Sequence, residues 1–151
     1  MASNHNFTIE HKFKSPFANI YDVILDFTKF GHFHPHMKAV KIVSKNQPNE
    51  IEYEVNEEVL LYGFIKLKPN YKATVLEIEK NKHVRYISQV KKNIFLTIDF
   101  IFSEDKDTGN TKVIEKVDVR GNKFIATIFL SLLKKSHLQM FQNFKSNKYA
   151  A

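Results

Sequence analysis

A continuous succession of strand patterns, followed by one long helix pattern, limits this sequence to very few folds. From Ala39 to Arg120, apolar and polar residues alternate in short segments that turn-forming residues separate. Alternation with a period of two indicates strands with one buried face. From Lys123 onward, apolar residues recur at helical spacing as far as Phe144. A helix of about 25 residues spans roughly 37 Å, so it can cross a small sheet and bury its apolar stripe there.

The links between the strand patterns are short, which predicts an antiparallel meander. The expected strands cover residues 39–44, 50–55, 61–67, 72–79, 83–90, 93–103 and 111–120. Within the fourth of these, Thr74, Leu76 and Ile78 share one face. A strong turn signal at residues 105–110 precedes the last strand.

The N-terminal segment predicts one further strand and two short helices. Residues 7–13 alternate between apolar and polar side chains. Ser15 is a suitable N-cap and Pro16 suits the first helical position. Thr28 offers a second helix start, and Pro35 disfavours helix at the residue before it. The helical region should therefore end before the expected strand at residue 39.

The composition excludes several classes of protein. The 151 residues suffice for one domain. The absence of cysteine excludes disulfides, thiol catalysis and cysteine-ligated metal centres, and it suits a cytoplasmic location. The first residues lack the apolar core of a signal peptide, and no apolar run approaches the roughly 18–20 residues of a membrane span. We therefore expect no integral membrane association.

The positive charge is concentrated near the C-terminal end. The formal net charge is +7, and residues 121–151 contain five lysines and no acidic residue. Such an end could attract an acidic partner or an anionic membrane surface, but a solvated helix face and a lysine-bearing tail are the favoured explanation. With only two arginines and four glycines, the chain lacks an RNA-recognition motif and a glycine-rich phosphate loop. No nucleic-acid partner is expected.

Two segments and the order of elements resemble a known superfamily. The segments are Lys14-Ser15-Pro16-Phe17, and Asp26 to Phe30 leading to Phe33-His34-Pro35. Together with a strand, two short helices, consecutive strands and a long C-terminal helix, they resemble START-like proteins of the helix-grip fold. That superfamily includes polyketide cyclase/dehydrase-like proteins, plant pathogenesis-related allergens and lipid-transfer domains.

The resemblance implies an α+β fold over a single domain, residues 1–151. A curved antiparallel sheet of about seven strands would wrap around the long C-terminal helix, with two short helices after the first strand. A hydrophobic cavity would lie between sheet and helix, and the passage from Phe30 to Pro35 would edge its mouth. Because the superfamily contains binders, transporters and cyclases, the fold alone does not give the function.

Three alternating histidines suggest a metal site at first sight. His32, His34 and His36 would share a face in an extended segment. However, the segment should leave a helix at Gly31 and turn at Pro35, so the three side chains should not point in one direction. The segment also contains no acidic residue. We therefore predict no metal site and no cofactor, and we place His34 nearest the cavity mouth.

Glu115 is the candidate with the most chemical interest. It shares the apolar face of its strand with Val113, Val117 and Val119. A carboxylate on that face must find a partner, or its pKa must rise. We expect it to lie in the interior, where it could contact a ligand.

The other predicted ligand contacts are cavity walls and a few inward polar groups. The polar groups are Tyr53, Thr74, Tyr86 and Ser88. The apolar walls are Phe30, Phe33, Phe64, Phe100 and Phe129, with Ile125 and Leu132 on the long helix. A sparse polar set in an apolar cavity is typical of a small-ligand site.

Three functions remain in competition. The first is binding of a small hydrophobic or amphipathic molecule between sheet and C-terminal helix. The second is a polyketide cyclase/dehydrase-type enzyme with Glu115 or a cavity tyrosine as general acid–base. The third is an interaction protein that uses its basic C-terminal end. The sequence leaves open the ligand, the oligomeric state and whether a reaction is catalysed.

Overall fold

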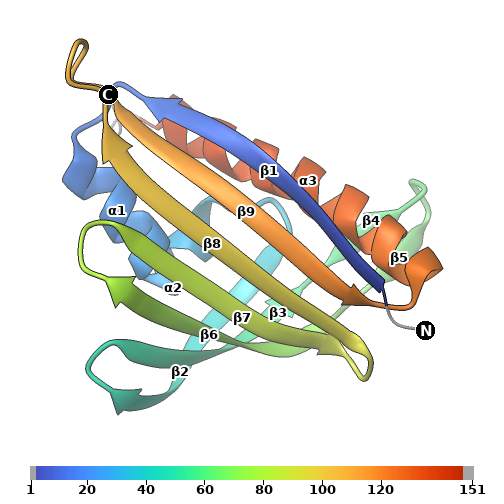
Figure 1. The fold of residues 1–151 in the computed structure, drawn as a ribbon. Coiled ribbons are helices and arrows are strands. Elements are labelled where there is room, and N and C mark those ends of the chain that lie inside the picture. The colour runs from blue at the N-terminus through green and yellow to red at the C-terminus, as the bar shows by residue number, and fades with distance from the viewer. Residues whose placement is uncertain (1–2, 148–151) are drawn as a thin grey trace.

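The computed structural model describes residues 3–147, which form one curved antiparallel sheet crossed by a long helix (Figure 1). The sheet has seven strands in the order β1-β9-β8-β7-β6-β3-β2, and a separate hairpin pairs β4 with β5. In chain order the elements are β1 (Ser3–Phe13), α1 (Phe17–Leu25), α2 (Phe27–Phe33), β2 (Met37–Gln47), β3 (Glu50–Glu57), β4 (Val59–Leu61), β5 (Ile65–Leu67), β6 (Asn70–Glu79), β7 (His83–Lys91), β8 (Ile94–Glu104), β9 (Thr111–Gly121) and α3 (Lys123–Ser146). The predicted α+β helix-grip architecture is confirmed.

The first and last strands in the chain, β1 and β9, lie side by side in the sheet. β1 pairs with β9 in unbroken antiparallel register from Ser3 opposite Gly121 to Phe13 opposite Thr111. The remaining strands from β6 to β9 follow one another as a meander, as the short links predicted. This closure of the chain on itself brings N-terminal side chains next to the interior face of β9.

The two short helices begin one or two residues away from the predicted caps. Pro16, rather than Ser15, occupies the N-cap position of α1, and it provides no side-chain cap. Asp26, rather than Thr28, caps α2, because its carboxylate accepts the Thr28 backbone N–H at 3.0 Å. α2 ends at Phe33, before His34-Pro35, as the proline predicted.

One predicted strand is wrong. Residues 61–67 comprise the last residue of β4, a turn and the whole of β5, instead of one strand of the sheet. Leu61 pairs with Ile65, so the loop consists of Tyr62, Gly63 and Phe64. Tyr62 and Gly63 adopt positive φ values of 54° and 80°, which a type I′ turn requires at both of its central residues. The alternation of Leu61, Gly63 and Ile65 concealed the turn, because the glycine stands at an apparently apolar position.

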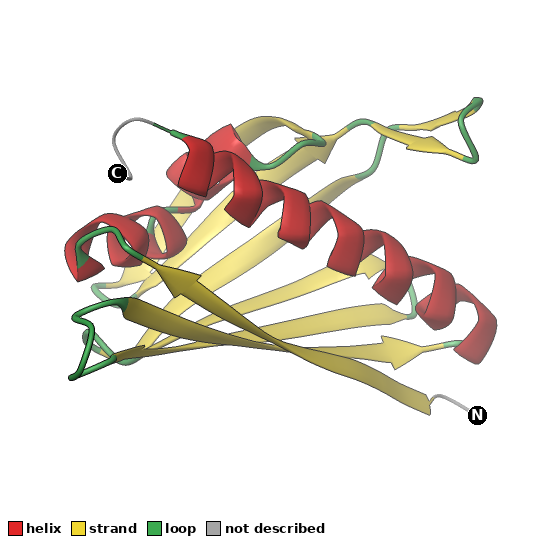
Figure 2. Ribbon diagram, turned by 90° about the horizontal axis from the view of Figure 1, so that it is seen from above, coloured by secondary structure: helices red, strands yellow, loops and turns green. Residues whose placement is uncertain are grey.

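α3 crosses the concave side of the sheet, with α1 and α2 at one end (Figure 2). The Asn122 side chain caps it by accepting the Phe124 backbone N–H at 3.0 Å. The C-terminal half buries Met140, Phe141 and Phe144 against the core. The N-terminal half is only partly buried, so its apolar stripe faces a space that the sheet does not fill. Among residues 3–147, no helix is long and apolar enough to cross a membrane.

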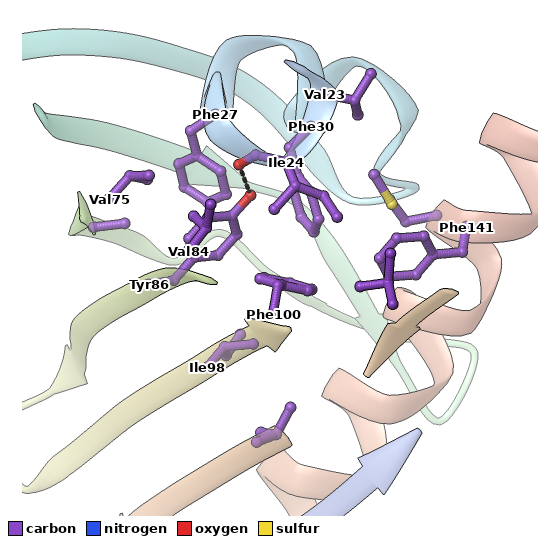
Figure 3. Packing of buried hydrophobic residues seen from close by; sticks show 14 of the residues in the cluster. Val23, Ile24, Phe27, Phe30, Val75, Val84, Tyr86, Ile98, Phe100 and Phe141 are labelled. Carbon is purple, nitrogen blue, oxygen red and sulfur yellow. Dashed lines mark hydrogen bonds between the residues drawn. The ribbon is translucent and has the colours of Figure 1, made fainter. Parts of the chain in front are cut away.

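Aromatic rings fill the core between α2, the sheet and the C-terminal half of α3 (Figure 3). Phe30 packs edge-on against Tyr86 at 5.4 Å between ring centroids, and Phe100 packs against Tyr86 at 4.9 Å. The Tyr86 hydroxyl donates a hydrogen bond to the Ile24 carbonyl oxygen. Burial raises the pKa of Tyr86 well above its usual range, so this hydroxyl stays protonated and remains a donor.

Candidate ligand-binding cavity

A cavity of about 480 Å³ lies between the curved sheet and α3. On α3 its wall is mostly apolar and ends in two polar residues: Ile125, Ile128, Phe129, Leu132, Leu133, Ser136 and His137. The sheet contributes Ala73, Tyr86, Ser88, Val90, Ile94, Leu96 and Ile98, and the β4–β5 hairpin contributes Val59, Leu61 and Leu67. The volume falls within the roughly 300–1,000 Å³ that small-molecule sites occupy.

Seven of the thirteen predicted contact residues line this cavity. They are Phe30, His34, Tyr86, Ser88, Ile125, Phe129 and Leu132. They come from α2 and the turn after it, from β7 and from α3, so segments far apart in the sequence converge on one space. Their contact with a ligand stays a prediction.

Three others lie in the core beside the cavity, and a fourth, Phe33, is partly buried against that core. Tyr53 is buried and packs edge-on against Phe27, which lines the cavity. Phe100 is buried behind Phe30 and Tyr86, Phe33 packs against Phe144, and Glu115 is completely buried.

The other two predicted contacts, Phe64 and Thr74, were placed wrongly. Phe64 lies in the turn of the β4–β5 hairpin and is 77% exposed. Thr74 lies on the outer face of β6, because Tyr71, Ala73 and Val75 face the interior. Both faces of this strand carry apolar side chains, so alternation alone could not choose between them. Pairing with β3 sets the register, with Tyr53 opposite Ala73.

The buried Glu115 carboxylate binds two histidines, one on each oxygen. His11 Nε2 lies 3.0 Å from Oε1, and His137 Nδ1 is hydrogen-bonded to Oε2. All three side chains are less than 5% exposed. Burial raises the pKa of Glu115, but the charge of His137 and the hydrogen bonds from both histidines outweigh burial and lower this pKa to about 2. The predicted inward orientation of Glu115 is confirmed, and the partners of its carboxylate are His11 and His137.

The fold explains why these three residues meet. β1 places His11 on the same interior face as Glu115 and two residue pairs along the strands, since Ile9 pairs with Glu115 and His11 with Val113. α3 then brings His137 over the same position from the opposite side. Because the carboxylate only accepts hydrogen bonds, each histidine presents an N–H to it. His137 therefore carries its proton on Nδ1 when the ring is neutral.

A second polar group lies in the same cavity wall, between the α2–β2 turn, β3 and β6. His34 Nδ1 accepts the His36 backbone N–H at 3.1 Å and lies 3.9 Å from Glu57 Oε1. Burial lowers the pKa of His34 well below its usual range, and the charges of His137 and His36 lower it further. His34 is therefore neutral, and its approach to Glu57 is a polar contact rather than an ion pair.

Glu57 and Tyr71 complete this group. Burial raises the pKa of Glu57, against the lowering effects of a hydrogen bond from Tyr71 and the charge of His137. Burial and the neighbouring Glu57 raise the pKa of the Tyr71 hydroxyl well above its usual range. The wall thus offers hydrogen-bonding groups of low charge in a largely apolar space.

The three alternating histidines do not act together. His32 is exposed on α2, while His34 and His36 line the cavity. In the part of the chain that the structure describes, no group of three or more histidine, aspartate or glutamate side chains is arranged to hold a metal ion.

Comparison with known proteins identifies the fold. No protein-family model matches the sequence, and no curated protein does so either. Among solved structures, Ara h 8.0201 matches with a TM-score of 0.70 at 13% identity, covering 93% of this chain and 95% of its own. The aromatase/cyclase Zhui from Streptomyces sp. R1128 matches with a TM-score of 0.75 at 8% identity, covering 93% and 91%.

A START superfamily protein from Mycobacterium smegmatis matches with a TM-score of 0.72 at 12% identity, covering 93% of this chain and 94% of its own. This chain has the START-like helix-grip fold. At such low identities the likeness concerns the backbone arrangement, so the roles of individual side chains must be argued from this structure.

Sequence reasoning missed many residues of the cavity wall, among them the polar side chains of Glu57, Tyr71 and His137. His137 had a readable signal, because it lies four residues from both Leu133 and Phe141 in the apolar stripe of α3. A histidine on such a stripe needs a polar partner in the interior. Tyr71 was missed because the opposite face of β6 was taken as the inner one.

Proposed function

We propose that this protein acts in the cytoplasm as a binder of a small hydrophobic or amphipathic molecule, held between the sheet and α3. The cavity of about 480 Å³ with its mostly apolar wall is the observation that carries this proposal. Burial of apolar ligand surface supplies about 2.5 kcal/mol per 100 Å², before the losses of motional freedom on association. The few polar groups orient the ligand.

Filling the cavity should abolish uptake. Leu132→Trp places an indole in the space beside Phe129 and should weaken binding of the neutral dye N-phenyl-1-naphthylamine at least about tenfold, because the dye and the indole compete for one volume. Dye fluorescence measures the affinity. Leu138→Trp is the matched control, since Leu138 is on the same helix, is 46% exposed and does not line the cavity. Equal affinity of wild type and Leu132→Trp would contradict the proposal.

The second candidate is a polyketide cyclase/dehydrase-type enzyme, and the contact between Glu115 and His137 favours it. A carboxylate that accepts a hydrogen bond from Nδ1–H of a histidine fixes the tautomer and the orientation of the ring. His137 also lines the cavity, so its other ring nitrogen is placed to exchange a proton with a bound molecule. This arrangement suits general acid–base catalysis at a carbon or oxygen atom.

Proton exchange on a carbon acid tests this candidate. In D₂O, the protein should accelerate deuterium incorporation next to the carbonyl of 2-tetralone, followed by NMR. His137→Gln should lower the exchange rate by about 10²-fold or more, the usual contribution of a general base. His32→Gln, at an exposed histidine, should keep the full rate. A rate equal in wild type and His137→Gln would remove the enzyme candidate and leave the binding proposal intact.

A further inference from the structure

Two histidines in the cavity wall have complementary hydrogen-bonding roles that their protein partners fix. His34 Nδ1 accepts the backbone N–H of His36 at 3.1 Å. Because the neutral ring has one acceptor and one donor nitrogen, the proton of His34 lies on Nε2. His137 Nδ1 donates to Glu115, so the lone pair of the neutral His137 ring lies on Nε2. One ring thus presents a donor and the other an acceptor.

Both remaining nitrogens face the cavity. His34 and His137 line it, although each residue is at most 6% exposed. Within residues 3–147, neither Nε2 atom has a hydrogen-bond partner in the protein. In partly or fully buried residues of the same range, every side-chain nitrogen or oxygen that is inaccessible to solvent does have such a partner. The two Nε2 atoms are therefore accessible, and the space next to them is the cavity.

The separation of the rings suits one shared oxygen atom. Their centroids are 5.8 Å apart and their planes are perpendicular, and no hydrogen bond joins them directly. An oxygen at about 2.9 Å from each Nε2, the usual hydrogen-bond distance, fits between rings at this separation. A hydroxyl group can accept from His34 and donate to His137 at the same time, whereas a carbonyl or ether oxygen can only accept.

The surroundings disfavour an anionic head group at this position. Glu57 Oε1 lies 3.9 Å from His34 Nδ1, and the Glu115 carboxylate lies directly behind His137. An anionic ligand group between the rings would face both acidic side chains in a poorly solvated space. Lys68 and Lys91 also line the cavity, but both side chains are exposed.

We propose that His34 and His137 form a donor–acceptor pair that binds a neutral hydroxyl group of the ligand. The ligand class is accordingly an apolar molecule with a hydroxyl at one end, rather than a fatty acid or a pure hydrocarbon. This inference rests on the proposed binding function. It adds a selectivity for ligands with a hydroxyl group, which a purely hydrophobic cavity would not have.

Near-isosteric probes test the pair. Displacement of N-phenyl-1-naphthylamine is measured with 4-phenylphenol, 4-methylbiphenyl and biphenyl-4-carboxylate. We expect 4-phenylphenol to bind about tenfold or more tightly than 4-methylbiphenyl, because two hydrogen bonds form only with the hydroxyl. The carboxylate should bind more weakly than the phenol. Equal binding of phenol and methyl compound would overturn the inference while leaving ligand uptake established.

Variants and NMR assign the preference to these histidines. His34→Phe keeps the ring but loses the donor, so it should bind both neutral probes with similar affinity, whereas the exposed control His32→Phe should keep the preference. A preference retained in His34→Phe would overturn the assignment. If that variant does not fold, ¹⁵N spectra of the wild type decide, because 4-phenylphenol must shift Nε2 of both His34 and His137. Unchanged Nε2 signals with bound phenol would refute the pair. Failure of both the dye and the probes to bind would refute the binding function with it.

Discussion

Replacing Glu115 by glutamine is expected to lower the free energy of unfolding by about 3–5 kcal/mol at neutral pH. This is the usual loss when one partner of a buried charged group is removed. Glutamine has nearly the same size, so packing is kept. Its amide offers one acceptor oxygen where two histidine N–H groups now bind, and one donor is left unpaired in the interior. Urea denaturation followed by circular dichroism gives the difference.

The pH dependence identifies the charge as the cause. The pKa of Glu115 is about 2 in the folded protein against an ordinary value of 4.5. A lowered pKa means that this stabilisation is fully present above about pH 4.5 and is lost as the pH falls towards 2, and it amounts to about 3 kcal/mol. Glu115→Gln should show a flatter decline over this window. Glu79→Gln, at an exposed glutamate, should show the same pH dependence of stability as the wild type. If Glu115→Gln changed the free energy of unfolding as little as Glu79→Gln, the result would contradict the buried cluster of Glu115, His11 and His137.

Phe141→Ala should destabilise the protein by about 3–5 kcal/mol, the cost of removing a fully buried aromatic ring. Phe141 is 1% exposed, and its ring lies 3.9 Å from the His11 ring and 5.8 Å from that of Phe13, centroid to centroid. Its loss would therefore open a cavity beside the Glu115 cluster as well as in the aromatic core.

The same helix offers a matched control for this substitution. Phe124 lies in the first turn of α3 and is 74% exposed, so Phe124→Ala should change the free energy of unfolding by less than about 0.5 kcal/mol. Thermal or urea unfolding of both variants measures the contrast. Similar losses for the two variants would mean that the C-terminal half of α3 does not pack on the sheet as described.

Local sequence patterns predicted most of the fold. They failed where both faces of a strand are apolar, and where a contact joins segments that are far apart in the sequence. Glu115 was placed correctly because the other face of β9 carries Lys116, Asp118 and Arg120, which cannot all be buried. Thr74 was placed wrongly because β6 is apolar on both faces. In that strand, pairing with β3 decides the orientation, and a single sequence does not show pairing.

The partners of Glu115 could not be read from the sequence for a related reason. His11 is 104 residues away along the chain and His137 is 22 residues away. The first contact depends on β1 pairing with β9, and the second on the line that α3 takes across the sheet. Each histidine could be recognised as a polar residue in an apolar pattern, but only the tertiary structure brings the three together.

The independence of the β4–β5 hairpin bears on how long a bound molecule stays. Val59, Leu61 and Leu67 of this hairpin form part of the cavity wall, yet its two strands pair with each other and not with the seven-stranded sheet. A two-stranded unit has little stability of its own, so it can open at a far lower free energy than the sheet. The time that a ligand stays bound would then depend on local opening of this hairpin, whereas most of the apolar contact area would come from the seven-stranded sheet and α3.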